Sequence, residues 1–310
     1  MLLSRARGLP RIAVTTRFPA YGWAGAAGIA AGMGLIFTHW RPWSDYWFAC
    51  VWFGYIGLVD AAVAQRDGRS LIRSRPRLFL WLLPLSAAGW WFFEAANLFV
   101  QNWHYLQPLD IPDWWKQIWS AVFFSPVIPA ELETALLLWP SGVVQRVSSA
   151  GPRLTASRRT AALLPLLGLG NLLLAVLYPQ YAFPLLWGCL ALILDPLNYR
   201  AGRPSILGAW ARGDWRVPVV LALGGTFCGL LWEAWNYWAF PKWWYTVPWV
   251  GFAKVFEMPL LGYLGYWAFA WEVYALVHFV RPRLPGLGPA PDAAAQAAAG
   301  AGEGLTGLGL

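Results

Sequence analysis

The sequence predicts an all-α polytopic membrane protein with about eight transmembrane helices, arranged as two parallel four-helix repeats. First, 58% of the 310 residues are hydrophobic and only 12% are charged, against about 25% charged residues in a soluble domain. Second, apolar runs long enough to span a bilayer recur along the chain. Third, a set of polar residues in the first half returns in the second half. A duplicated four-span unit accounts for all three observations.

The predicted spans divide evenly between two halves, residues 1–148 and residues 149–281. In chain order they cover about residues 20–38, 43–64, 78–100, 120–142, 160–178, 182–197, 217–240 and 258–280. In the first span, Gly28 and Gly32 form a small-residue face of the kind that lets two helices approach closely. The fourth span is interrupted by Pro126, which removes a helical hydrogen bond that protein or water must replace. Each half therefore has an even number of spans, and both halves should have the same orientation.

The basic residues follow the positive-inside pattern. Only Arg41, Lys116, Lys242 and Lys254 lie outside the N-terminal arm, the alternate connections and the segment after the last span. This distribution predicts that both termini are cytoplasmic, with the protein in the inner membrane of a bacterium. It also accounts for the net charge of +8 without a nucleic-acid partner.

The two ends of the chain differ from the spans in composition. Residues 1–18 form a basic arm that, with the apolar run behind it, resembles a signal peptide. Because many spans follow, we expect the first helix to be retained. Residues 282–310 are rich in Gly, Ala and Pro, and we expect them to be a disordered tail.

Two stretches, one in each half, place the same polar residues inside apolar, tryptophan-rich sequence. The first copy contains Glu94, Asn97, Trp103, Tyr105, Pro108 and Glu133, and the second contains Glu233, Asn236, Trp243, Tyr245, Pro248 and Glu272. A further set of matches ends the second and sixth spans, where Trp52, Asp60, Arg66, Gly68 and Arg69 answer Trp187, Asp195, Arg200, Gly202 and Arg203. The offset between copies stays between about 134 and 140 residues. We therefore expect a pseudo-two-fold axis along the membrane normal.

Four acids in these stretches are candidate catalytic residues: Glu94, Glu133, Glu233 and Glu272. A charged side chain at the centre of a bilayer costs about 2.5 kcal/mol or more, so an acid there usually has a function. Burial disfavours the charged form, which leaves a protonated carboxyl able to act as a general acid. In the alternative interpretation, the acids pair across the repeat interface and only hold the halves together.

We expect the four acids to line one cavity or two pseudo-equivalent cavities with tryptophan walls. The second copy is richer in tryptophan around its acid, because Trp232 and Trp235 stand where the first copy has Phe93 and Ala96. This difference predicts that Glu233 matters more than Glu94.

A larger set of residues around these acids forms the candidate substrate-binding site. It comprises Asn97, Asn236, Trp103, Tyr105, Trp232, Trp235, Trp243, Tyr245, Glu131 and Glu257. Each Asn lies one helical turn from its Glu, so its amide can bond a protonated carboxyl or a polar substrate group. Tryptophan faces can stabilise a cation. They can also pack a core or form an ordinary interfacial belt.

The polar residues at the ends of the second and sixth spans suggest anchoring. Asp60 and Asp195 are each followed by arginines, which predicts Asp–Arg pairs that fix the topology. A site for a lipid phosphate is the alternative. His39, His104 and His278 are isolated from one another in the sequence. We therefore predict no dedicated metal site and no cofactor.

The order of these motifs resembles the small membrane lycopene cyclases of bacteria, archaea and fungi. The resembling residues are Glu94 and Asn97, Trp103-His-Tyr105 and Pro129-Ala-Glu131-Leu-Glu133, then Glu233 and Asn236, Trp243-Trp-Tyr245 and Glu272, with Ala268 where the first copy has its proline. The similarity covers spans 3–4 and 7–8. Those proteins are also built from duplicated helical units and cyclise isoprenoid ends through protonation.

The resemblance and the buried acids together predict an integral-membrane enzyme that acts on an apolar, isoprenoid-type lipid. In this reading it is a lycopene cyclase-like isomerase or terpene cyclase of carotenoid biosynthesis, in which a buried Glu in a tryptophan-lined cavity starts cyclisation by protonation. Its partner would be the isoprenoid substrate or a membrane lipid, and the sequence is compatible with a homo-oligomer. One alternative is a proton-coupled transporter with a Glu site at the midplane. Another is a non-catalytic lipid-binding or assembly protein.

Overall fold

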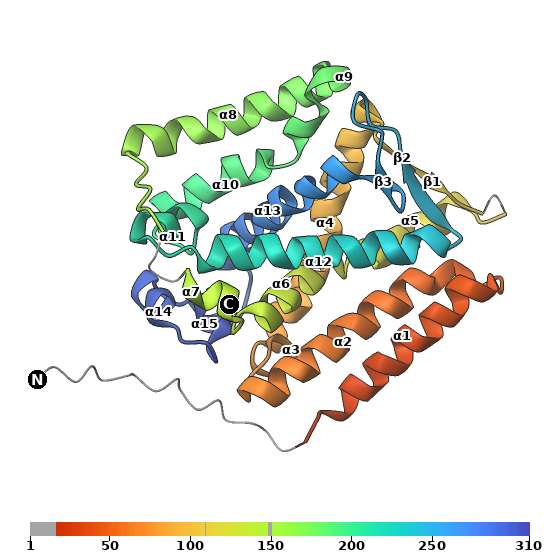
Figure 1. Ribbon diagram of the computed structural model, residues 1–310, viewed down its shortest axis with the longest axis horizontal. Helices are drawn as coiled ribbons and strands as arrows, with labels where there is room; N and C mark the ends of the chain where they lie inside the picture. The colour runs from red at the N-terminus through yellow and green to blue at the C-terminus, as the bar shows by residue number, and fades with distance from the viewer. Residues whose placement is uncertain (1–16, 109, 148–150) are drawn as a thin grey trace, which may run out of the picture.

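The protein is an all-α polytopic membrane protein (Figure 1). The computed structural model describes residues 17–108, 110–147 and 151–310, so nearly all of the predicted basic arm lies outside the described residues. Within the described residues, eight helical segments are long and apolar enough to cross a membrane, as predicted. They are Ala20–Thr38, Trp43–Asp67, Pro76–Val100, Asp113–Leu138, Arg158–Leu177, Pro179–Arg200, Arg216–Trp238 and Leu260–Arg283.

The first four spans are built from both continuous and broken helices. Their elements are α1 (Ala20–Thr38), η1 (Trp43–Tyr46), α2 (Trp47–Asp67), α3 (Leu71–Ser74), α4 (Pro76–Val100), α5 (Asp113–Phe124), α6 (Val127–Leu138) and α7 (Gly142–Arg146). The fourth span starts at residue 113, earlier than the predicted 120, and is two helices. The break falls at Pro126, which has no N–H to donate. Ser86 of α4 satisfies the backbone there, because its hydroxyl donates to Phe124 O at 2.6 Å and accepts from Ile128 N at 3.0 Å.

The second four spans are also built from continuous and broken helices. Their elements are α8 (Arg158–Leu177), α9 (Pro179–Ala182), η2 (Phe183–Leu186), α10 (Cys189–Arg200), α11 (Ile206–Arg212), α12 (Arg216–Trp238), η3 (Leu260–Leu264), α13 (Gly265–Val280) and η4 (Arg281–Arg283). The sixth span breaks before α10 at Gly188, whose φ of 97° suits a residue without a Cβ. Its counterpart in the first half, α2, runs unbroken.

Four short strands, which the sequence analysis did not predict, connect the spans at one end of the bundle. Strand β1 (Trp103–Leu106) pairs with β2 (Lys242–Tyr245), and β3 (Lys254–Val255) pairs with β4 (Met258–Pro259), both antiparallel. We call this end the strand end. Figure 1 shows α3, α7 and α11 at the opposite end, which we call the tail end.

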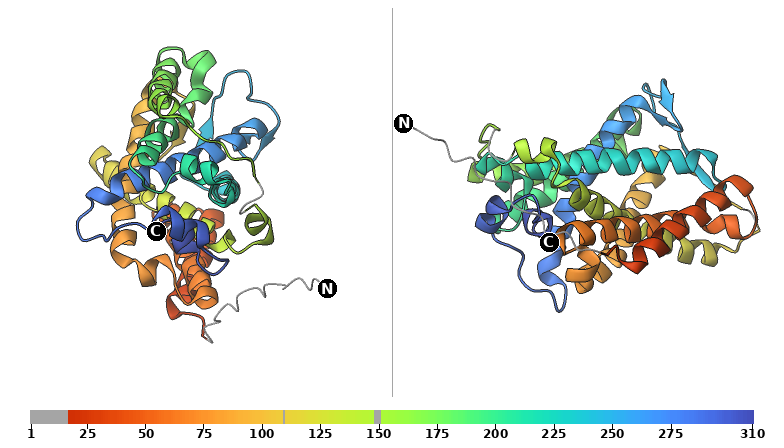
Figure 2. Two further views of the ribbon diagram at one scale, coloured as in Figure 1. Left: turned by 90° about the vertical axis from the view of Figure 1, so that its left-hand side faces the viewer. Right: turned by 60° about the horizontal axis from the view of Figure 1, so that its bottom comes forward.

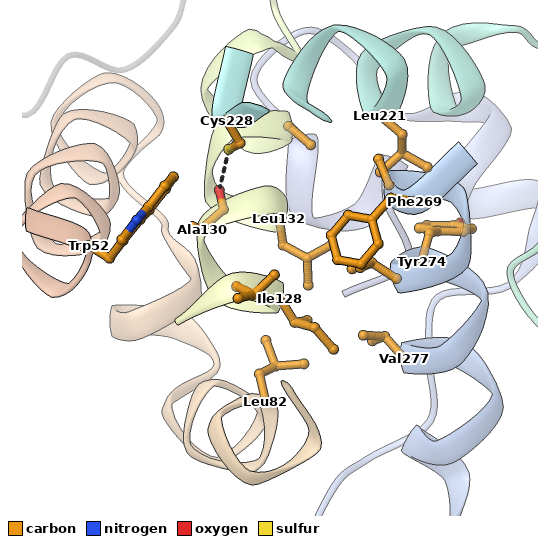
Figure 3. Close-up of a cluster of buried hydrophobic side chains, with 14 of the residues drawn as sticks. Trp52, Leu82, Ile128, Ala130, Leu132, Leu221, Cys228, Phe269, Tyr274 and Val277 are labelled. Carbon is orange, nitrogen blue, oxygen red and sulfur yellow. Dashed lines mark hydrogen bonds between the residues drawn. The ribbon is translucent and has the colours of Figure 1, made fainter. Parts of the chain in front are cut away.

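Helix α6 lies at the centre of the bundle (Figure 3). All ten of its residues from Val127 to Leu136 are buried. Trp52 of α2, Leu82 of α4, Cys228 of α12 and Tyr274 of α13 surround it, each at most 2% exposed. The Thr134 hydroxyl joins this packing through bonds to Tyr55 Oη at 2.7 Å and Cys228 Sγ at 3.1 Å.

Glycines bring α1 and α2 into close contact, as the small-residue face predicts. A Cβ on Gly25 would lie 2.6 Å from the Gly54 carbonyl oxygen, and one on Gly32 would lie 2.5 Å from Val51. The second half uses the same device, since a Cβ on Gly168 of α8 would lie 2.7 Å from a carbonyl of α10. Such close approach lets helices associate by packing where no hydrophobic effect separates them from lipid.

The predicted Asp–Arg pairs at the ends of spans 2 and 6 are wrong. Asp60 accepts bonds from the Ser70 hydroxyl and from a backbone N–H in α3. Asp195 accepts bonds from the first two N–H groups of α11. The start of a helix has N–H groups without partners in the helix, and these aspartates satisfy them. Arg66 instead pairs with Asp67 and donates to the last carbonyls of α6.

The segment 282–310 is folded, contrary to the predicted disorder. It contains α14 (Ala293–Ala298) and α15 (Gly304–Gly307) and packs on the tail end, opposite the strands (Figure 2). The buried Arg216 guanidinium donates to the Ala299 carbonyl, and Trp139 Nε1 donates to Gly300 O at 3.0 Å. Composition gave no sign of this because the tail is held largely through backbone carbonyls, which every residue type offers.

Candidate functional site

A cavity of about 980 Å³ lies between the two halves at the strand end. Its volume is near the upper limit of the usual range for small-molecule sites. Aromatic side chains from both halves form a large part of its wall. They include Trp47, Phe48, Trp90, Trp103, Trp119, Phe123, Phe124, Trp187, Trp232, Trp243 and Phe269.

The β1–β2 pair that borders the cavity is symmetric under exchange of the repeats. Trp103 lies opposite Tyr245, and Tyr105 lies opposite Trp243. In the repeat alignment Trp103 answers Trp243 and Tyr105 answers Tyr245, so the exchange maps the ladder onto itself. This local relation is the one that a pseudo-two-fold axis between the halves would produce.

The two asparagines hold the strands and do not line the cavity. Asn97 Nδ2 donates to Trp103 O at 2.8 Å, and its Oδ1 accepts from Trp103 N at 3.4 Å. Asn236 makes the same two bonds to Trp243, both at 2.8 Å. Each amide therefore replaces a missing strand partner and positions its tryptophan at the cavity wall.

Glu94 lines the cavity and is held by three donors on one oxygen. Oε1 accepts from Trp90 Nε1 at 2.8 Å, from Trp103 Nε1 at 3.0 Å and from the Tyr105 hydroxyl. Oε2 has no hydrogen-bond partner among the described residues and keeps accessible surface. The carboxyl of this cavity-lining residue is thus fixed through one oxygen, while the other has no hydrogen-bond partner among the described residues.

The Tyr105 hydroxyl remains a donor in this arrangement. Tyr105 is 38% exposed, and its hydroxyl donates to Glu94 Oε1. Burial, together with the neighbouring Glu94 carboxyl, raises the pKa of Tyr105 well above its ordinary value. Tyr105 therefore keeps its proton and its bond to Glu94.

Glu233, the counterpart of Glu94, is sealed from the cavity. Its side chain is 0% exposed. Its Oε1 accepts from Tyr245 Oη at 2.7 Å and from Tyr266 Oη at 2.9 Å, and its Oε2 is buried. Both tyrosines line the cavity, so they separate Glu233 from it. Tyr266 was not among the predicted site residues.

The other candidate acids occupy different places. Glu131 lines the cavity and is 5% exposed. Glu133 is fully buried away from it, within electrostatic reach of Asp60. Glu272 borders a separate hollow of only about 10 Å³. It accepts a bond from Leu190 N at 2.9 Å, in the first turn of α10.

Glu257 forms an ion pair with Lys242 beside the cavity, where Lys242 but not Glu257 belongs to the wall. Of Glu94, Glu133, Glu233 and Glu272, only Glu94 lines this cavity, so the expectation that the four acids line one cavity or two equivalent ones is wrong.

The predicted tryptophans also divide into wall and core. Trp232 lies in the wall, stacked on Trp90 with ring centroids 5.4 Å apart. Trp235 is 9% exposed and packs edge-on against Trp52 at 5.0 Å, outside the cavity. Residues three apart lie near the same face of a helix, so the difference comes from what each ring meets: Trp232 meets the cavity and Trp235 meets Trp52.

Several wall residues were not predicted from the sequence. Trp47 donates from Nε1 to Pro241 O at 2.8 Å and stacks on Trp243 at 6.2 Å. Trp187 stacks on Phe93 at 5.3 Å and meets Trp103 at 5.9 Å. Trp187 had appeared only as a repeat match of Trp52. The glycine that follows it, Gly188, was the one sign in the sequence of the helix break that lies beside Trp187.

No family model, curated protein or solved structure matches this chain.

Proposed function

We propose that the protein is an integral-membrane enzyme that takes an apolar, isoprenoid-type lipid into the tryptophan-lined cavity and cyclises it after protonation by Glu94. The aromatic wall suits an apolar chain, because burying apolar surface is favourable by about 25 cal/mol per Å². Tryptophan faces around the carboxyl suit a transient carbocation.

The arrangement of the Glu94 carboxyl is the observation that carries this proposal. Trp90, Trp103 and Tyr105 all donate to Oε1. A protonated carboxyl with Oε1 as its carbonyl oxygen would therefore carry its proton on Oε2, the oxygen without a hydrogen-bond partner among the described residues. A fixed acid whose proton points at an apolar substrate is what general-acid catalysis requires.

This geometry favours Glu94 over Glu233 as the acid, the reverse of the order expected from the tryptophan content. Glu233 has the same relation to its strand tyrosine, but Tyr245 and Tyr266 cover it. We assign Glu233 the structural role of holding these two tyrosines in the wall.

The packing below the cavity supports an enzyme over a transporter. Toward the tail end, Trp52, Leu132 and Tyr274 are each at most 1% exposed (Figure 3). A transporter must open its site to both faces, and these side chains would all have to move. A lipid-binding protein without chemistry would share the cavity, so only a reaction separates that alternative.

The test is product analysis in a bacterial host that makes acyclic isoprenoids such as squalene and lycopene. Cyclisation through protonation adds one proton and loses another, so the product is an isomer of the substrate. We expect new isomers in extracts from cells with the wild-type protein, and incorporation of one deuterium when membranes that contain the protein convert unlabelled substrate in D2O. Glu94→Gln should reduce this conversion by about 100-fold or more, while the bound lipid still copurifies.

Glu233→Gln is the matched comparison, because it makes the same change in the other repeat. We expect it to lower thermal stability while conversion remains within a few-fold of the wild type. Full conversion by Glu94→Gln would refute its role as the acid. Absence of any new isomer with the wild-type protein would refute cyclisation of the lipids tested and favour the non-catalytic alternative.

A further inference from the structure

Glu131 is a second carboxyl on the cavity wall, and the fold does not explain it. It lies on α6, is 95% buried and lines the cavity. Neither of its oxygens receives a hydrogen bond within the described part of the chain. An acid without a partner inside a membrane span costs about 2.5 kcal/mol or more. Its presence therefore needs a reason other than stability.

The second half shows that this position can be apolar. The offset that relates Glu133 to Glu272 places Ala270 of α13 where the first half has Glu131. Ala270 is 0% exposed in the packed core. The repeat therefore keeps the Glu–Asn–Trp–Tyr arrangement in both copies, whereas the unpartnered acid on the wall occurs in one.

The two carboxyls on the cavity differ in a way that suits opposite halves of a proton transfer. Glu94 is fixed by three donors on one oxygen. Glu131 has no donor, so an ionised Glu131 would be poorly compensated in this apolar wall. An ionised carboxylate in such surroundings is stabilised most when a positive charge lies beside it or when it takes up a proton. The helices that carry the two acids, α4 and α6, pack against each other.

We propose that Glu131 is the base that ends the reaction. This step rests on the proposed function. The Glu94 O–H bond breaks as a new C–H bond forms at a substrate double bond. A second double bond attacks the cation and forms the ring C–C bond. Glu131 then takes a proton from a carbon next to the new cation, and the electrons of that C–H bond form the ring double bond. The site returns to its starting state when Glu131 releases this proton to solvent and Glu94 takes one up from solvent.

The test is the product set of Glu131→Gln in the same host, with Glu131→Asp as the conservative variant and Glu303→Gln as a control for an acid outside the cavity. An amide is a poor base, while Glu94 can still protonate the substrate. We therefore expect Glu131→Gln to replace the wild-type isomer by products one water heavier, or by isomers with a displaced double bond. Conversion should fall by about 100-fold. Glu131→Asp should restore the wild-type isomer at a lower rate, and Glu303→Gln should not change it.

The outcomes separate this role from the proposed function itself. If Glu131→Gln forms only the wild-type isomer at any rate, or forms no product while lipid still copurifies, Glu131 is not the base. If the wild-type protein forms no isomer, the proposed cyclisation and the role of Glu131 both fail. If Glu131→Gln does not fold, the failure of Glu131→Asp to restore the wild-type isomer overturns the assignment.

Discussion

The ring of Tyr266 occupies the space that Gly229 leaves open on α12. A Cβ at Gly229 would lie 2.3 Å from this ring. The corresponding residue in the first half is Trp90, which stands one turn before Glu94 and donates to it at 2.8 Å. Tyr266 donates to Glu233 at 2.9 Å. The two halves thus give their glutamates an equivalent donor, one from the same helix and one from the following span.

Gly229→Ala should therefore displace Tyr266 and destabilise the second half. Overpacking of this kind typically costs about 1–3 kcal/mol, and Glu233 would also lose a hydrogen bond. The midpoint of thermal unfolding in detergent, followed by tryptophan fluorescence, should fall. Gly34→Ala in α1 is the control, because a Cβ there meets nothing within 4 Å. Equal midpoints for the two variants would contradict the close contact.

The two hydrogen bonds by which Asn236 holds strand β2 should be important for stability. Its side chain is 0% exposed and bonds both the N–H and the C=O of Trp243. Asn236→Ala leaves two backbone groups without these partners, which should cost about 2 kcal/mol or more. Asn97→Ala should cost less, because Asn97 is only partly buried and water can replace its amide. The same unfolding measurement ranks the two variants. A smaller loss of stability for Asn236→Ala than for Asn97→Ala would contradict this explanation.

The eight spans could be predicted because a run of about 20 apolar residues is the length that a helix needs to cross a bilayer. The site could be predicted in part by the same logic. Glu94, Trp103, Tyr105, Trp232, Trp243 and Tyr245 were singled out as polar or aromatic residues in a duplicated apolar stretch, and all line the cavity.

The exposure of each acid could not be predicted, because it depends on packing between helices distant in sequence. Glu94 and Glu233 occupy the same position in their repeats, but Tyr266 from another span covers only Glu233. The difference between Trp90 and Gly229 was visible in the repeat alignment and indicated a space to be filled. Nothing in the sequence indicated which side chain fills it.

Arg216 should be one of the main residues that hold the folded tail in place. It is 3% exposed, pairs with Asp214 at 2.8 Å and donates to the carbonyls of Gln296, Ala297 and Ala299. Removing one partner of a buried ion pair costs about 3–5 kcal/mol. Arg216→Ala should therefore free residues 284–310 for cleavage by an added protease.

Mass spectrometry of the digested protein measures this cleavage. Arg283→Ala, a change at an exposed arginine of the neighbouring segment, is the control and should leave the tail protected. Rapid cleavage of the tail in the wild-type protein would contradict the packed arrangement.

Reporter fusions should place the tail end in the cytoplasm and the strand end on the other side. The tail end carries Arg73 in α3, Val147 after α7 and Gly208 in α11, while Gln107 and Val247 follow β1 and β2 at the strand end. Basic residues concentrate in the connections at the tail end, which favours cytoplasmic placement. Alkaline phosphatase fused at either strand-end position should be active, because it folds only outside the cytoplasm. Fusions at the three tail-end positions should be inactive, and a fluorescent protein fused there should fluoresce. Since two spans separate each connection from the next on the same side, a single exchanged result would contradict parallel repeats.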